Sequence, residues 1–310
     1  MDNTDKIVID NDAGGDDAMA IFIALLNEKH FNGPKLIALT TVNGNTDENN
    51  VCQNNQRILK VAKRQEVPIY RGSKSAIVIP SPAGNHYRLD GLGDSGEMVT
   101  GLVPAKSENA VAILIDLSKK YEGNLTIITI GPVTNIGLAV ALDPGFLGRL
   151  KHLYIGAGHI HSEKHPEKEF NARTDPEAYY IIARNATPEK VTIVPFSQIK
   201  DSLDFPKQWR MQVLGAIDTE IVKEQNKFEQ VALKRSDRWQ KLDPATVAVA
   251  IRPDLVQEYR YAKHSIHLHG DNRGIIRSDY VEKDQANVRI LHSVKYQDYQ
   301  EFLLEIFSKE

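Results

Sequence analysis

Short runs of consecutive apolar residues alternate along most of the chain with longer stretches in which apolar residues recur at helical spacing. The short runs are rich in Ile, Val and Leu and predict buried strands over residues 7–10, 35–41, 67–70, 125–130, 153–158 and 191–195. The stretches between them predict helices over residues 18–27, 46–64 and 109–120, and further helices that begin near 136 and 175. Because this alternation is typical of βαβ units, it predicts an α/β fold: an open, mostly parallel sheet flanked by helices.

The last third of the chain follows a less regular pattern. The elements predicted here are strands over 265–269 and 287–292 and helical stretches over 205–238, 244–251 and 296–309. The first helical stretch is highly charged and is expected to break near Gly215. Since no repeat, low-complexity tract or linker divides the sequence, residues 1–310 are expected to form a single domain.

A long irregular segment, residues 72–105, interrupts the alternation. It is rich in proline and glycine and carries His86 and Tyr87 near its middle. Irregular segments of this length within a compact domain are usually either functional loops or disordered. The composition of its motif Asp90-Gly91-Leu92-Gly93-Asp94 favours a functional loop.

Charge and cysteine content narrow the classes of function. The 38 basic and 41 acidic residues give a formal net charge of -3, which argues against nucleic-acid or membrane binding through bulk charge. The single cysteine, Cys52, cannot form an intrachain disulfide, so a reducing compartment is expected. Because no signal-peptide pattern and no apolar stretch of membrane-spanning length is present, we expect a cytoplasmic protein.

Four carboxylates lie close together where the first strand passes into the first helix: Asp10, Asp12, Asp16 and Asp17. Two glycines, at positions 14 and 15, loosen the turn between them. Asp16 and Asp17 fall where a helix N-terminus favours negative charge, so capping alone would explain these two. Four acids at such close spacing repel one another unless a cation lies among them, and the sequence therefore predicts a divalent metal site.

Other polar groups follow the carboxyl ends of the predicted parallel strands, where ligands bind in open sheets. They are Asn43 and Asn45, the backbone around Ile130, and Glu169 with Asn171. This set consists of carboxylates, amides and carbonyls and contains no lysine or arginine cluster. We therefore expect a hard cation with oxygen ligands and a neutral polyhydroxy ligand such as a sugar, rather than an anionic phosphate.

A series of motifs along nearly the whole chain resembles that of the inosine-uridine-type nucleoside hydrolases. The N-terminal aspartate signature of that family resembles residues 10–17, with Ala13 where proline is common. The further motifs are Thr41-Val42-Asn43-Gly44-Asn45, Asp90-Gly91-Leu92-Gly93, Gly131-Pro132-Val133-Thr134-Asn135, Glu169-Phe170-Asn171, Asp175-Pro176-Glu177-Ala178, Asp243-Pro244, and Arg273-Gly274 with Asp279. One such motif would be weak, but the full series in order is a strong resemblance.

The resemblance implies a calcium-dependent ribonucleoside N-ribohydrolase with a Rossmann-like core, acting on a nucleoside as its small-molecule substrate. By matched position, Ca²⁺ would be bound by Asp12, Asp17, Asp243 and the main-chain carbonyl of Ile130. Asp12 would also accept the proton of the attacking water. The ribose would be held by Asp16, Asn45 and Asn171, with Glu169 on the 5′-hydroxyl side. Relatives of this kind imply a homodimer or homotetramer.

Two positions depart from the family pattern. Leu242 occupies the place where several members carry a histidine that protonates the leaving base, and leucine cannot donate a proton. Assistance to the leaving base must then come from elsewhere, and Trp239, His86 and Tyr87 are the candidates. Glu163 lies where an asparagine usually contacts the ribose 5′-hydroxyl, and a second acid beside Glu169 would disfavour 5′-phosphates.

Three rival interpretations remain open. Leu242 is consistent with a family member that binds ribosides without cleaving them, although the intact Asp12 argues for catalysis. A haloacid-dehalogenase-type phosphatase would use Asp10-Asn11-Asp12, but Gly14 and the lack of a basic phosphate clamp disfavour it. Two histidine groups, His159, His161 and His165 and then His264, His267 and His269, lack cysteines and the usual closed spacing of zinc sites, so we expect ordinary histidines there.

Overall fold

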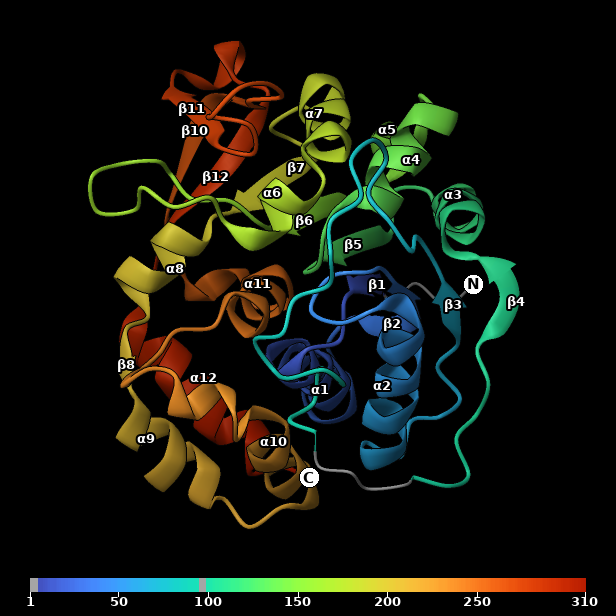
Figure 1. The fold of residues 1–310 in the computed structure, drawn as a ribbon, viewed down its shortest axis with the longest axis vertical. Helices are drawn as coiled ribbons and strands as arrows, with labels where there is room; N and C mark the ends of the chain where they lie inside the picture. The colour runs from blue at the N-terminus through green and yellow to red at the C-terminus, as the bar shows by residue number, and fades with distance from the viewer. Residues whose placement is uncertain (1–4, 95–98) are drawn as a thin grey trace.

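A single ten-stranded sheet runs through the computed structural model, which describes residues 5–94 and 99–310 (Figure 1). Its strand order is β11-β10-β12-β7-β6-β5-β1-β2-β3-β4. Neighbouring strands from β12 to β4 are parallel, whereas β10 is antiparallel to β11 and β12. The strands are β1 (Lys6–Asn11), β2 (Lys35–Thr41), β3 (Ile69–Arg71), β4 (Lys106–Asn109), β5 (Leu125–Thr129), β6 (His152–Gly156), β7 (Val191–Val194), β10 (Val256–Ile266), β11 (Ile276–Tyr280) and β12 (Val288–Val294). The predicted α/β class is confirmed.

Helices cover both faces of this sheet (Figure 1). They are α1 (Gly15–Phe31), α2 (Glu48–Val61), α3 (Ala110–Lys120), α4 (Thr134–Leu142), α5 (Phe146–Arg149), α6 (Phe170–Thr174), α7 (Pro176–Asn185), α8 (Phe196–Ser202), α9 (Lys207–Gln212), α10 (Glu220–Glu229), α11 (Leu242–Ile251) and α12 (Tyr296–Phe307). Among the described residues, none of these helices combines the length and the apolarity that crossing a bilayer requires.

The alternating side chains of β1 show that helices pack on both faces of the sheet. Ile7 and Ile9 point into a core shared with α1, α11 and α12, while Val8 between them points into a second core shared with α3, α4 and α7. All three side chains are at most 1% exposed. A strand that is buried on both faces must be apolar at every position, which is why its sequence lacks the polar alternation of a surface strand.

Strand order places the loops that carry the polar motifs next to one another. β1 lies between β2 and β5, and β6 follows β5. Because these four strands are parallel, the segments after their carboxyl ends meet at one edge of the sheet. These segments carry the acidic turn, Asn45, Ile130 and the Glu169–Asn171 pair, so the sheet assembles them from distant parts of the sequence.

The helical region predicted over 205–238 does break near Gly215, as expected, but it is shorter and more divided than predicted. The chain forms α9 and α10 with intervening 3₁₀ turns, and β8 (Phe205–Pro206) pairs antiparallel with β9 (Arg238–Trp239). Pro206 precedes α9, and Thr219 caps α10 by accepting from the N–H of Val222. These local stop and start signals divide a stretch whose charge and composition otherwise favour one helix.

The sheet also extends further at both edges than predicted. β10 begins at Val256 and not near 265, and neither β11 nor β4 was expected. All four residues of β4 are exposed, and β10 carries charged residues such as Arg260 on its outer part. Edge strands of this kind lack the apolar run that identifies a buried strand in the sequence.

Candidate active site

The acidic turn between β1 and α1 is built by hydrogen bonds to its own backbone. Asp17, in the first turn of α1, accepts from the N–H groups of Gly14 (2.7 Å) and Asp12 (3.1 Å). Ala13 between them takes a left-handed conformation with φ of 43°. Asp17 therefore does cap the helix, as one of the two interpretations of the sequence expected, but its carboxylate also faces other acids.

The two glycines of this turn make room for an aromatic ring. A Cβ at Gly14 or at Gly15 would lie 2.8 Å from ring atoms of Tyr87, closer than atoms in van der Waals contact. Tyr87 itself is only 2% exposed. The glycines thus allow the irregular segment after β3 to pack directly on the acidic turn, which brings His86 and Tyr87 to the site.

The motif Asp90-Gly91-Leu92-Gly93-Asp94 locks that segment in place. Asp90 Oδ1 accepts from the N–H groups of Leu92 (2.7 Å) and Asp94 (2.8 Å). Asn54 of α2 donates to the carbonyl of Asp90 (2.6 Å) and to that of Ala13 (3.1 Å). The motif therefore supports the acidic turn; the expected loop continues through residues 95–98, which lie outside the described residues.

Asp10 lies behind the turn and supports it from within the sheet. Its buried carboxylate accepts from Thr40 Oγ1 (2.6 Å), Asn135 Nδ2 (2.8 Å) and Thr129 Oγ1 (3.3 Å). Burial raises the pKa of Asp10 to about 6, and these hydrogen bonds oppose the rise. These bonds come from β2, β5 and α4 and hold the Asp10 carboxylate within the sheet, where it supports the turn.

Three other carboxylates converge. One oxygen from each of Asp16, Asp17 and Asp243 lies within 4.8 Å of the others. Burial and the charge of Asp16 raise the pKa of Asp17 to about 7. Burial and the charges of Asp16, Asp17 and Asp12 raise the pKa of Asp243 well above its ordinary value. Buried acids that repel one another in this way form a donor set of hard oxygens that fits a divalent cation such as Ca²⁺.

Asp12 is held beside this cluster by Asn45. Its Oδ2 accepts from the Asn45 N–H (2.7 Å) and its Oδ1 from Asn45 Nδ2 (3.2 Å), which also donates to Asp17 (3.0 Å). Burial, and then the charge of Asp17, raise the pKa of Asp12 well above its ordinary value. One amide side chain therefore fixes the orientation of two of the acids.

Hydrogen bonds also fix Glu169 and Asn171, which follow β6 at the same edge of the sheet. Glu169 caps α6, accepting from the N–H groups of Gly158 (2.7 Å), Ala172 (2.9 Å) and Asn171 (3.0 Å). Asn171 Nδ2 donates to the carbonyls of Ile130 (2.8 Å) and Gly156 (3.0 Å). These bonds set both side chains at the edge of the sheet before any ligand arrives.

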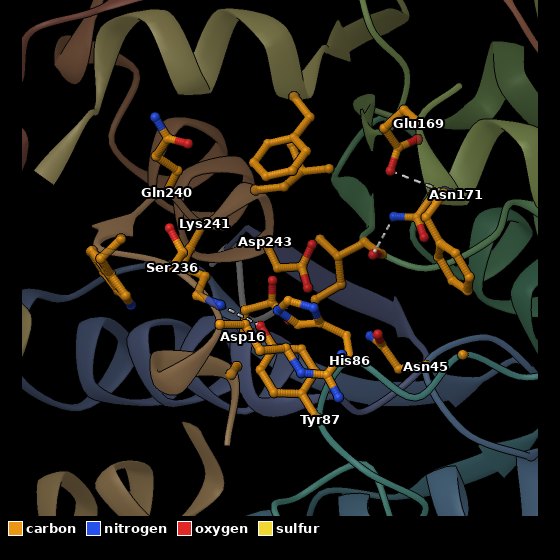
Figure 2. A pocket seen from close by; sticks show the side chains of 18 of the residues that line it. Asp16, Asn45, His86, Tyr87, Glu169, Asn171, Ser236, Gln240, Lys241 and Asp243 are labelled. Atoms are coloured by element: carbon orange, nitrogen blue, oxygen red, sulfur yellow. Dashed lines mark hydrogen bonds between the residues drawn. The ribbon is translucent and has the colours of Figure 1, made fainter. Parts of the chain in front are cut away.

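A cavity of about 510 Å³, lined by both polar and apolar side chains, joins these groups (Figure 2). In this view Asp16 and Asp243 lie near the middle, with Asn45, Glu169 and Asn171 to the right and Ser236, Gln240 and Lys241 to the left. The cavity size is that of a small-molecule site. Of the site residues predicted from the sequence, those that line it are Asp16, Asn45, His86, Tyr87, Ile130, Glu169, Asn171, Trp239 and Asp243.

Glu163 is not brought to this cavity. It is exposed on the loop between β6 and α6 and is not among the cavity-lining residues. Its position does not support the expected contact with a ribose 5′-hydroxyl. Asp12 and Asp17 are fully buried in the turn that carries Asp16, so they adjoin the cavity without forming its surface.

Sequence reasoning missed the cations at the cavity. Arg173, Arg235, Arg238 and Lys241 all line it, contrary to the expectation of a site without basic residues. Arg235 donates to the carbonyl of Asn85 (2.9 Å) and so links the segment after α10 to the loop that carries His86. Three of the four come from residues 235–241, which were predicted to lie on or beside a long helix, and no sequence signal placed them at the site.

Lys241 belongs to a buried network at the left side of the cavity. Its Nζ donates to Tyr87 Oη (2.6 Å) and lies 3.7 Å from Glu229 Oε1. Glu229 in turn pairs with Arg210 (2.8 Å) and accepts from the indole N–H of Trp239 (3.0 Å). These contacts therefore fix the position of Lys241 Nζ at the cavity wall.

Comparisons with known proteins agree with this architecture. The family model of the inosine-uridine preferring nucleoside hydrolases matches residues 7–301. The chain is 31% identical over 261 residues to the inosine-uridine preferring nucleoside hydrolase of Leishmania major, covering 82% of this chain and 81% of that protein. A solved purine-preferring ribonucleoside hydrolase from Gardnerella vaginalis superposes with a TM-score of 0.86 at 25% identity, covering 98% of both chains.

A solved plant nucleoside hydrolase gives a TM-score of 0.84 at 25% identity, covering 98% of this chain and 99% of the other. The fold and the site define an α/β protein with a cluster of carboxylates at a small-molecule cavity. The chain belongs to the inosine-uridine preferring nucleoside hydrolase family.

Proposed function

We propose that this protein is a Ca²⁺-dependent hydrolase that cleaves the N-glycosidic bond of ribonucleosides to free base and ribose. The observation that carries the proposal is the convergence of Asp16, Asp17 and Asp243 beside the fixed carboxylate of Asp12, at the base of a cavity of nucleoside size. Mutually repelling acids of this kind are stabilised either by protons or by a cation, and a set of oxygen donors suits calcium.

The residues proposed to hold Ca²⁺ are Asp12, Asp17, Asp243 and the carbonyl of Ile130. When bound, the ion would lower the pKa of a coordinated water and hold the ribose diol. Asp12 accepts the proton of the attacking water, and its hydrogen bonds from Asn45 keep one geometry for that transfer. The surrounding carboxylates stabilise positive charge as the sugar becomes oxocarbenium-like.

The proposed ribose side of the cavity runs from Asp16, near the middle of Figure 2, to Asn45, Asn171 and Glu169 on the right. Asp16, Asn45 and Asn171 present a carboxylate and amides that can orient sugar hydroxyls, and Glu169 adjoins them. This arrangement leaves the opposite wall, with Lys241 and Gln240, for the base.

On that wall Lys241 is the group best placed to assist the leaving base. The Trp239 N–H is committed to Glu229. Burial and the charge of Asp16 raise the pKa of Tyr87 well above its ordinary value, so its hydroxyl stays protonated and hydrogen-bonds Asp16. An ammonium has three donors, and Lys241 uses one on Tyr87, which leaves N–H groups for the departing base. His86, packed edge-on against Tyr87 at 4.8 Å, can contact the base from the cavity surface.

We expect Lys241→Met to lower kcat on inosine by about 10- to 100-fold with a smaller change in KM, because a preorganised donor acts on the charge that develops on the base. The loss should be much smaller on 4-nitrophenyl riboside, whose leaving group needs no such assistance. Lys241→Arg keeps the positive charge and serves as the matched control. Equal losses on both substrates would assign Lys241 a structural role instead.

Metal binding should also depend on pH in a defined direction. The pKa of Asp17 is raised to about 7, against an ordinary value near 4, so the metal-free folded protein binds a proton that the unfolded chain releases. Ionising this group therefore destabilises the metal-free fold as pH rises through this range, while calcium requires the ionised form. We expect the rise in melting temperature on adding Ca²⁺ to be larger at pH 8 than at pH 5.5. A rise that is equal or larger at pH 5.5 would contradict the proposed ligand set.

The second candidate function is riboside binding without cleavage. Leu242 at the cavity wall favours it, because this side chain cannot protonate a base. Inosine, guanosine, adenosine, uridine and cytidine, each tested with calcium and with a chelator, separate the two. Cleavage of at least one nucleoside only with calcium supports the hydrolase; binding of nucleosides without any cleavage supports the alternative. A cytoplasmic homodimer or homotetramer remains a prediction.

A further inference from the structure

We propose that the loop between β6 and α6 holds a second metal site, of the zinc class, formed by His159, His165 and Glu167 with Asp201 of α8 beside them. One ligand atom from each of the first three residues lies within 4.8 Å of the others. His159 Nε2 is 3.3 Å from Glu167 Oε1, and His165 Nε2 is 3.1 Å from Asp201 Oδ1. Imidazole nitrogens with carboxylate oxygens suit zinc, whereas the all-oxygen aspartate cluster suits calcium.

Burial distinguishes this group from ordinary surface histidines. His159 and His165 are 5% and 6% exposed, and their rings stack at 5.6 Å. The Nδ1 atom of His159 is buried and has no hydrogen-bond partner among the described residues. An unpartnered buried ring nitrogen is unfavourable, so His159 is not held as a fully hydrogen-bonded structural histidine.

The other histidine group of the chain shows the contrast. His264 is equally buried, but its Nε2 meets Tyr179 Oη at 2.7 Å and its Nδ1 meets Ser278 Oγ at 2.7 Å. Both ring nitrogens are satisfied by hydroxyl groups, which makes His264 a structural residue. His159 differs from His264. Its Nε2 faces the carboxylate of Glu167, and its Nδ1 has no partner among the described residues.

Two lysines now neutralise the carboxylates of the site. Lys200 Nζ donates to Glu167 Oε1 (2.8 Å), and Lys164 pairs with Asp201. Both are at least partly exposed, with 24% and 71% of their side chains accessible, so each ammonium can move into water. A divalent ion would replace Lys200 on Glu167 and bring the two histidines into the same set of contacts.

The site clamps the loop to α8 beside the cavity. The His159 ring stacks on Phe196 at 5.7 Å, and Phe196 lines the cavity. The Phe196 N–H donates to the carbonyl of Gly158 (2.7 Å), whose own N–H donates to Glu169. The loop follows β6 and passes α8 before it enters α6 (Figure 1). Metal binding would therefore stiffen the segment that carries Glu169, and the inference does not depend on the hydrolase activity.

Calorimetric titration of the full chain with Zn²⁺, in saturating Ca²⁺, tests the site. We expect one equivalent to bind, and His165→Gln and Glu167→Gln each to weaken it by about 100-fold or more. Glu167 is 47% exposed on its side chain, so that variant should fold normally. His161→Gln, an exposed histidine of the same loop, is the matched control and should bind zinc as the wild type does.

Three results would overturn the proposal. The first is zinc affinity weaker than about 10 μM in the wild type. The second is equal zinc binding by Glu167→Gln, His165→Gln and His161→Gln. The third is zinc binding lost in Asp243→Ala but kept in Glu167→Gln, which would assign the ion to the aspartate cluster.

Discussion

At Ca²⁺ concentrations that saturate the variant, Asp12→Asn is expected to lower kcat for nucleoside hydrolysis by about 1000-fold while KM changes little. The proposed role of Asp12 is to accept the proton of the attacking water, and loss of a positioned general base lowers rates by roughly 10²- to 10⁴-fold. Its carboxylate accepts from both the N–H and the side-chain amide of Asn45, so it is held in one orientation. Steady-state kinetics and calcium titration together separate loss of the base from loss of metal.

Asp10→Asn provides the matched control. It removes the same charge from a buried aspartate of the same strand end, but among the described residues the Asp10 carboxylate bonds only to Thr40, Thr129 and Asn135. We expect Asp10→Asn to lower thermal stability and to keep kcat within about tenfold of wild type. If Asp12→Asn retains more than a tenth of the wild-type kcat, Asp12 is not the base.

Asp243→Ala is expected to lose calcium and activity together. Removal of one of three converging acids should weaken Ca²⁺ binding by about 100-fold or more, because affinity for calcium follows the number of charged ligands. In metal-free protein at pH 8 the same substitution relieves repulsion from Asp16, Asp17 and Asp12, which contribute to the raised pKa of Asp243. The metal-free variant should therefore melt at or above the temperature of the metal-free wild type.

The melting temperature of the metal-free variant distinguishes a metal ligand from a structural residue. A structural aspartate would lower the melting temperature with and without metal. Asp254→Ala removes a carboxylate just beyond the same helix, where Asp254 pairs with Arg252 at the surface, and should bind calcium normally. Retention of wild-type calcium affinity by Asp243→Ala would contradict its assignment as a ligand.

The parts of the fold that were predictable are those whose signal is local. Ile7, Val8 and Ile9 form an unbroken apolar run because both faces of β1 are covered, and such runs identified the central strands. The acidic turn was equally visible, since its aspartates lie within eight residues. The exposed edge strands β4 and β11 carry no comparable run and were missed.

The parts of the site that were not predictable depend on contacts between distant residues. Lys241 meets Tyr87 across 154 positions of sequence, and Arg235 meets Asn85 across 150. Neither pairing leaves a pattern in either segment. The family resemblance assigned Asp16 to the ribose and not to the metal, whereas the structure places its carboxylate with those of Asp17 and Asp243. Its proposed role in holding the sugar stays a prediction.

The most direct test of the account measures both products from one nucleoside. Inosine or uridine is incubated with the full chain in phosphate-free buffer, and free base and reducing sugar are quantified with Ca²⁺, with a chelator, and with Asp12→Asn. The account predicts equal amounts of base and ribose with calcium, and almost none in the other two conditions. Tight binding of the nucleoside without release of either product, or release that persists in the chelator or in Asp12→Asn, would contradict it.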